Sequence, residues 1–267
     1  MKKRPEKKSS SKPSNTPPEY KNLGKLKKSS GDDTVRLNKF IADAGVCSRR
    51  DADELIKKGV IKLNGKTVTE MGVRVSANDE VFYKGKKLQK ERFVYILLNK
   101  PKDYITTTED PQERKTVMSL VKEACNERIF PVGRLDRQTT GLLLFTNDGQ
   151  LAKKLTHPSH NIRKLYEATL NKPLEEEHFL KIKEGFELED GAVTVDDIAL
   201  SVEGDHIIGL EIHIGRNRIV RRIFEHFGYE VVKLDRVVYA GLTKKNLARG
   251  QWRYIGEKEL VRLLNYK

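Results

Sequence analysis

Hydrophobic residues between positions 36 and 59 recur with the spacing of two short amphipathic helices. The first apolar stripe lies at i, i+3, i+4 and i+7 and consists of Leu37, Phe40, Ile41 and Ala44. Gly45 follows where a left-handed helix end belongs. Ser48 and Asp51 have the spacing of a capping box, so a second helix is expected to begin here and to end at Gly59.

A β-hairpin is predicted directly after these helices. The apolar run at 60–63 leads into Asn64-Gly65, the strongest two-residue hairpin signal, and 66–68 begins the return strand. Basic residues occupy positions of this small unit that miss its apolar stripes: Arg36, Lys39, Arg49, Arg50, Lys57, Lys58, Lys62 and Lys66. They form either a polyanion-binding surface or an ordinary solvated face.

The rest of the chain mixes strand and helix patterns. Residues 93–98 and 142–145 are continuous apolar runs typical of buried strands, and 165–170 alternates, with Tyr166 on the more apolar face. Residues 219–228 have helical spacing, with Ile219, Ile223 and Phe227 on one face. The opposite face of that helix carries several arginines, which suits a role in binding better than one in stability.

Composition narrows the class of partner. The 267-residue chain carries a formal charge of +14, which favours nucleic acid. Residues 1–34 hold ten Lys/Arg against four Asp/Glu and few apolar groups, so they are predicted to be a disordered basic tail. The sequence has no apolar run long enough to span a membrane, lacks an apolar leader, and has only two cysteines. A cytoplasmic protein is expected.

Asp136 is the most informative single residue. It stands in the run Gly133-Arg134-Leu135-Asp136-Arg137-Gln138-Thr139-Thr140-Gly141-Leu142-Leu143, just before a buried strand. Alone, an Asp near Gly is more often a turn residue than a catalytic one. The whole run, however, resembles the GRLDxxTxGLL signature of the RsuA/RluB family of ribosomal RNA pseudouridine synthases. The resemblance implies that Asp136 is the catalytic nucleophile.

Two further motifs extend the resemblance. Lys164-x-Tyr166 is similar to the family motif whose tyrosine stacks on the target base, and Gly215 to Ile223 is similar to GRNRQVRRM, whose penultimate arginine, Arg221 here, pairs with the aspartate. Asp103 departs from the family, which usually has glycine after its Lys-Pro turn. The candidate RNA-binding residues are Arg134, Arg36, Lys39, Arg49, Arg50, Arg216, Arg218 and Arg222.

The implied architecture is α+β. It comprises the tail at 1–34, a small S4-like RNA-binding domain at 35–83, a linker at 84–91, and a synthase domain at 92–267 with a mixed, largely antiparallel sheet. The implied function is isomerisation of a flipped-out uridine in ribosomal RNA by a monomer that needs no cofactor or metal. The large-subunit RNA is favoured over the small-subunit RNA. An inactive RNA-binding assembly factor and a metal-dependent nuclease are the alternatives, and the nuclease lacks the clustered carboxylates it would need.

Overall fold

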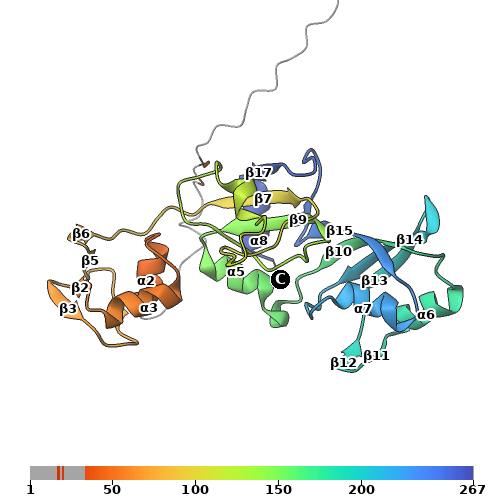
Figure 1. Ribbon diagram of the computed structural model, residues 1–267, viewed down its shortest axis with the longest axis horizontal. Coiled ribbons are helices and arrows are strands. Elements are labelled where there is room, and N and C mark those ends of the chain that lie inside the picture. The colour runs from red at the N-terminus through yellow and green to blue at the C-terminus, as the bar shows by residue number, and fades with distance from the viewer. Residues whose placement is uncertain (1–16, 19, 21–33, 267) are drawn as a thin grey trace, which may run out of the picture.

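The computed structural model describes residues 17–18, 20 and 34–266. Two units follow one another along the chain, a small one at the left of Figure 1 and a larger one built on a long twisted sheet. Most of the predicted disordered tail lies outside the described residues. Within it, Tyr20 lies on the larger unit, where its hydroxyl donates to Ile255 O at 2.9 Å and its ring meets Tyr95 edge-on at 5.4 Å.

The small unit contains the predicted helices and hairpin. Ser48 and Asp51 form the expected capping box at the start of the second helix. The apolar stripes of both helices face the strands, with Leu37, Ile41, Ala52 and Ile56 buried in one cluster with Ile61, Val75 and Val81. The elements are β1 (Val35–Arg36), α2 (Leu37–Asp43), α3 (Arg49–Lys57), β2 (Ile61–Leu63), β3 (Lys66–Val68), β4 (Arg74–Val75), β5 (Val81–Tyr83) and β6 (Lys86–Lys87).

The boundary of this unit lies later than the sequence indicates. Lys86 and Lys87 were expected in a linker, but they pair with β5 and extend the sheet order to β3-β2-β5-β6. Leu88 also packs on the cluster. A polar strand at a sheet edge has no apolar period to reveal it. The connection therefore shortens to about residues 89–92, where Glu91 N donates to Asp43 O in the small unit and the Glu91 carboxylate accepts from Arg128 N in the large one.

The large unit is organised around a nine-stranded mixed sheet, largely antiparallel as expected. Its main order is β13-β14-β10-β15-β9-β7-β17, with β16 beside β15 and β8 beside β9. The strands are β7 (Tyr95–Lys100), β8 (Phe130–Pro131), β9 (Thr140–Thr146), β10 (Lys164–Leu170), β13 (Asp197–Ser201), β14 (Gly204–Ile212), β15 (Val231–Tyr239), β16 (Leu242–Thr243) and β17 (Trp252–Tyr254). A separate hairpin consists of β11 (Phe186–Leu188) and β12 (Gly191–Val193).

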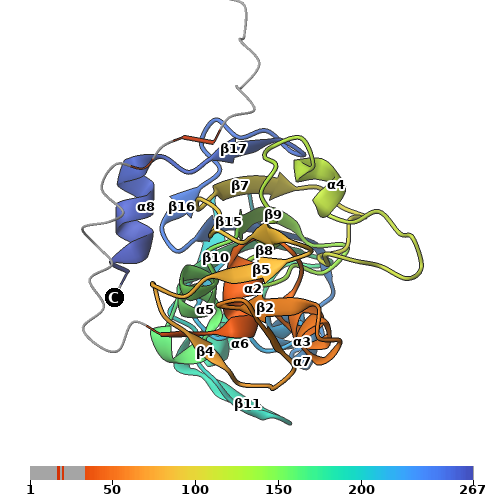
Figure 2. The same ribbon diagram turned by 90° about the vertical axis from the view of Figure 1, so that its left-hand side faces the viewer.

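Helices cover the sheet unevenly, and this divides the large unit into two halves. Around β7 and β9, α4 (Met118–Val121) lies on the side opposite α8 (Glu257–Leu264), as Figure 2 shows, while α5 (Gly149–Thr156) shares the α8 core. Both strands are therefore buried on two faces, which explains their unbroken apolar runs. The other half packs α6 (Glu176–Glu184) and α7 (Ile219–His226) on β10 and β14.

The two halves meet where β9 and β15 pair in parallel. Asp235 faces Thr140 and Arg236 faces Gly141, and every other pairing of this sheet among the described residues is antiparallel. Gly141 has φ +106°, and a Cβ there would lie 2.3 Å from Arg236 O. Glycine is therefore required for the strands to approach this closely. The loop that contains Asp136 enters β9 at this junction.

Candidate active site

Asp136 lies in a short loop that Lys100 holds in place. The Lys100 side chain is fully buried at the end of β7, and its Nζ donates to Asp136 O (3.1 Å), Arg137 O (3.2 Å) and Thr139 O (2.8 Å). Burial lowers the pKa of Lys100 to about 8, and the nearby Asp136 charge counteracts the shift. A cation bonded to three carbonyls of one loop fixes that loop's backbone. Lys100 is thus a functional residue that pattern analysis missed, signalled only by a charge at the end of an apolar strand.

A second loop, which contains Asp103, supports the first. Asp103 has φ +68°, the left-handed conformation that glycine adopts most easily, and it stands at the position where the family motif usually has glycine. Its backbone N donates to Arg137 O at 2.9 Å and its carboxylate accepts from Gln138 at 3.0 Å. Thr106 Oγ1 donates to Leu135 O at 2.8 Å, on the other side of Asp136.

The Asp136 side chain is half-buried and lines a pocket of about 210 Å³. Within the described part of the chain, its carboxylate makes no hydrogen bond and no ion pair. The lining also includes Tyr166 and five basic residues: Arg134, Lys164, Arg216, Arg218 and Arg236. An unpartnered carboxylate in a basic pocket is free to act on a ligand. The pocket therefore brings together five of the predicted residues, namely Asp136, Tyr166, Arg134, Arg216 and Arg218.

Arg221 is buried on α7 close to Asp136, but the predicted ion pair is absent among the described residues. Its Nη1 donates instead to Val231 O at 2.5 Å, and its Nε is buried without a partner. Burial lowers the pKa of Arg221, and the Asp136 charge opposes that shift, so the two groups interact across space without touching. The helix register turns the Arg221 guanidinium toward β15, which explains why it does not reach the carboxylate.

The remaining arginines of this region are engaged with the β11–β12 hairpin or with their own helix. Arg222 binds the Asp190 carboxylate through both Nη atoms at 2.8 and 2.7 Å. Arg216 donates to Gly191 O and Ala192 O, each at 2.8 Å. Arg218 lies 3.6 Å from Glu225. Arg222 lies outside the pocket lining, so the structure separates it from Asp136.

The predicted RNA-binding residues of the small unit belong to β1, α2 and α3, which lie apart from β9 and β10 in Figure 1. Arg36, Arg49 and Arg50 are exposed, and Lys39 pairs with Asp43 at 2.5 Å. They form a second basic surface and do not contribute to the pocket.

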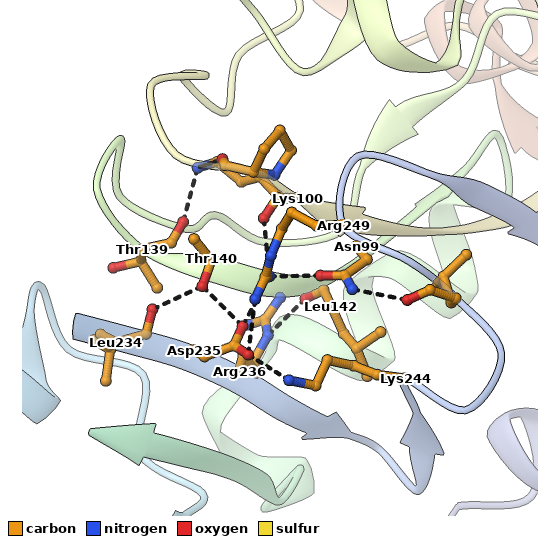
Figure 3. A network of polar contacts seen from close by, with 12 residues as sticks. Asn99, Lys100, Thr139, Thr140, Leu142, Leu234, Asp235, Arg236, Lys244 and Arg249 are labelled. Carbon is orange, nitrogen blue, oxygen red and sulfur yellow. Dashed lines mark hydrogen bonds and ion pairs between the residues drawn. The ribbon is translucent and has the colours of Figure 1, made fainter. Parts of the chain in front are cut away.

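A partly buried polar network lies at the junction of β9 and β15 (Figure 3). The Asp235 carboxylate binds both Nη atoms of Arg249 at 3.0 Å, and it also accepts from Lys244 and from Thr140 Oγ1. Burial alone would raise the pKa of Asp235, but these hydrogen bonds hold it below its usual value. Asn99 accepts from Arg249 at 2.6 Å and joins β7 to the network.

Two pocket residues are absent from the predicted site residues: Lys164, which the sequence indicates only as part of the Lys164-x-Tyr166 motif, and Arg236. Lys164 Nζ donates to His213 O at 2.6 Å, and burial, with the neighbouring Arg236 cation, lowers its pKa to about 8. Arg236 is 3% exposed, donates from Nε to Leu142 O at 2.8 Å, and lies over the Tyr239 ring at 4.4 Å. Its place in the site depends on strand register, which residue patterns do not reveal.

The described residues contain no helix with the length and apolar character needed to cross a bilayer. They also contain no group of three or more His, Cys, Asp or Glu side chains that could hold a metal ion.

The chain matches two protein-family models: residues 35–81 match the S4 domain, and residues 94–226 match RNA pseudouridylate synthase. It is 45% identical over 232 residues to ribosomal large subunit pseudouridine synthase B of Bacillus subtilis (strain 168), covering 85% of this chain and 95% of the relative. It is 37% identical over 235 residues to the dual-specificity RNA pseudouridine synthase RluF of Escherichia coli (strain K12), covering 87% and 79%. A crystal structure described as a pseudouridylate synthase matches with a TM-score of 0.61 and 30% identity, over 86% of this chain and 99% of that one.

Proposed function

This chain belongs to the RsuA/RluB family of RNA pseudouridine synthases, and from that premise we propose that it converts one uridine of large-subunit ribosomal RNA into pseudouridine. The ribosomal substrate follows from the relatives that share most of the chain. The large subunit is favoured because the Bacillus subtilis relative, with 45% identity, is named for it.

Asp136 is the nucleophile of the proposed reaction. The observation that carries this assignment is its carboxylate, half-buried and without a partner among the described residues, in a pocket that contains five basic side chains. A nucleophilic carboxylate must be ionised and must be free to approach C1′ of the ribose. Two cations, Lys100 and Arg221, lie close enough for their charges to interact with that of Asp136.

Tyr166 is the platform on which the flipped uracil stacks. Removing a base from a folded RNA costs a few kcal/mol, and an aromatic face recovers part of it. Tyr166 is half-buried, lines the pocket with Asp136, and packs against the cores of both halves of the sheet, which keeps its ring fixed. Arg134 is exposed at the pocket and is suited to a phosphate or to the stack that the base vacates.

The basic face of the S4 domain, with Arg36, Lys39, Arg49 and Arg50, contacts the RNA away from the pocket. Such contacts to phosphates position a folded RNA without reading its sequence. The protein would act as a monomer in the cytoplasm, where ribosomal RNA is assembled in bacteria.

The test is to map pseudouridines in ribosomal RNA from cells of the source organism that have the gene, lack it, or carry Asp136→Asn. The proposal predicts that one large-subunit pseudouridine disappears without the gene and returns only with the wild-type copy. Loss of a small-subunit pseudouridine instead would show that the substrate is small-subunit ribosomal RNA. An unchanged map combined with defective ribosome assembly would support the inactive assembly factor.

A further inference from the structure

Lys164 and Arg236 lie immediately beside Tyr166. In the pairing of β10 with β15, Tyr166 is the direct cross-strand partner of Arg236, and Lys164 is two residues away on the same strand. Cross-strand partners and i, i+2 neighbours project from the same face of a sheet. The register shifts between Leu165 and Tyr166, and a bulge of this kind re-aims side chains next to a site. A base stacked on Tyr166 therefore lies within reach of both cations.

Both cations retain unused hydrogen-bonding capacity. Arg236 Nη2 is buried and has no partner among the described residues, although the guanidinium is held by Leu142 O and by the Tyr239 ring. Lys164 Nζ is directed by His213 O at 2.6 Å and by Ile214 O at 3.4 Å. Buried donors without partners are rare in native proteins, and one beside a pocket is available to a group that enters the pocket.

Neither cation is neutralised within the described part of the chain. The carboxylate next to Arg236, that of Asp235, is already bound by Arg249 and Lys244. Asp196 is engaged by His213 at 2.8 Å. Among the residues that the structure describes, Asp136 forms no ion pair with either cation and is the only carboxylate in the pocket lining, against five Lys/Arg. The side of the pocket next to Tyr166 thus holds an excess of positive charge that attracts an anion.

The proposed reaction creates an anion at this place. When the Asp136 carboxylate forms a bond to C1′, the C1′–N1 bond breaks, and its electron pair leaves with the uracil. The detached ring carries the negative charge over N1, O2 and O4 until C5 attacks C1′ and displaces Asp136. The proton on C5 is then lost and N1 gains one, so that the product is an isomer of the substrate.

Given that reaction, we propose that Lys164 and Arg236 are catalytic residues that bind the detached uracil anion at its carbonyl oxygens. They stabilise charge that develops only after the glycosidic bond begins to break, as an oxyanion site does. The flanking RNA phosphates carry charge as well, but Arg134 and Arg218 are the exposed cations of the pocket and are better placed for them. Arg236, at 3% exposure, meets only a group that enters the pocket.

Single-turnover kinetics on an RNA fragment containing the mapped uridine test this assignment. Arg236→Gln and Lys164→Gln should each lower the rate at saturating RNA by about 100-fold, the order found when one donor to a developing anion is removed. The RNA Kd should stay within about threefold of wild type, and Arg236→Lys should recover part of the rate. Lys233→Gln is the matched control. Lys233 is an exposed cation on β15, the strand that contains Arg236, and it lies outside the pocket lining.

A weaker RNA Kd with an unchanged saturating rate would overturn the assignment, because the cations would then bind a phosphate. Absence of product with the wild-type chain would instead contradict the proposed function itself. If the Arg236 variant does not fold, the Lys164 variant carries the kinetic test.

An equilibrium measurement covers the case in which neither variant folds. The wild-type chain is bound to the same RNA with an abasic ribose at the target, and is titrated with uracil and with 5-nitrouracil, a similar ring that is an anion at neutral pH. We expect the anion to bind at least tenfold more tightly. Equal binding of the two rings by the wild-type chain would refute the assignment. If a variant of Lys164 or Arg236 folds, loss of the preference for the anion in that variant would show that the replaced residue causes it.

Discussion

Tyr166 on β10 and Arg236 on β15 are direct partners across the sheet, at a bulge in the pairing of these two strands. The pairing joins residues 70 positions apart and places the proposed base platform next to a buried guanidinium. Arg236 in turn faces Gly141 on β9, the strand that the Asp136 loop enters. One pair of neighbouring strands thus connects all the groups proposed to act on the base.

Replacing Asp136 with Asn should abolish pseudouridine formation and leave RNA binding intact. The amide is nearly the same size but is a very poor nucleophile. The Asp136 carboxylate makes no hydrogen bond or ion pair among the described residues, so the variant should fold, with a Tm lowered slightly by the loss of the charge interaction with Lys100 and Arg221. Single-turnover assays and RNA titrations would measure both effects, and turnover above about 1% of wild type would contradict the assignment.

Arg221 and Arg222 are adjacent but should behave differently. Arg221→Ala removes a buried cation that interacts with Asp136, so the saturating rate should fall by roughly 10- to 100-fold. Arg221→Lys keeps the charge and should recover part of it. Arg222→Ala only releases Asp190 on the β11–β12 hairpin and should leave the rate within about threefold. The reverse result would show that the motif register is wrong by one residue.

The catalytic rate should fall as the pH rises through about 8. Lys164 and Lys100 both have a pKa of about 8, so each loses its proton in this range. The charged groups near Lys164 are Arg236, which lowers its pKa, and Asp196, which raises it. Arg236→Gln removes the repulsion and should move the Lys164 transition to higher pH. A pH profile of the residual rate, compared with that of wild type, checks the direction.

The free energy of unfolding should rise over the pH range in which loss of the Lys164 proton lowers the catalytic rate. Its pKa is lower in the folded chain than its usual value of 10.5, so the charged form opposes folding below pH 8, and the cost disappears as the pH rises from about 8 to 10.5. Lys164→Met should therefore raise the Tm by about 2–4 °C at pH 7 while lowering activity. The Tm difference from wild type should vanish near pH 10.5, and a constant difference would exclude the charge as its cause.

Gly141→Ala should be strongly destabilising. The backbone has φ +106°, and the new Cβ would lie 2.3 Å from Arg236 O and 2.6 Å from Asp235 Oδ1, so β9 and β15 would have to separate. We expect a loss of about 3 kcal/mol or more, from strain and overpacking together. Gly209→Ala on β14 is the control, because its nearest neighbour is Ala199 O at 3.8 Å. Urea denaturation would give the free energy of unfolding of both variants. A large loss for Gly141→Ala alone would show that the close approach of β9 and β15 is its cause, and similar losses in both would contradict this.

Local patterns were sufficient to predict the capped helix after Ser48, the Asn64-Gly65 hairpin and the buried strands around Asp136, because each depends on neighbouring residues in the chain. Lys100, Lys164 and Arg236 could not be assigned in this way. Their roles arise from pairings and hydrogen bonds between distant segments, and a cation in a strand has the same local pattern whether it faces solvent or a pocket. The pairing predicted between Arg221 and Asp136 is not a hydrogen bond or ion pair among the described residues, because the turn of α7 relative to β15 directs the guanidinium to Val231 O.

Glu91 links the small unit to the large unit through one hydrogen bond to each. Its backbone N donates to Asp43 O, and its carboxylate accepts from Arg128 N, so the two contacts limit how far the S4 face and the pocket can separate. For an RNA that contacts both the S4 domain and the pocket, this link restricts the distance between the two contacts. We therefore expect the three-dimensional path of the RNA to contribute to the choice of the uridine that is modified.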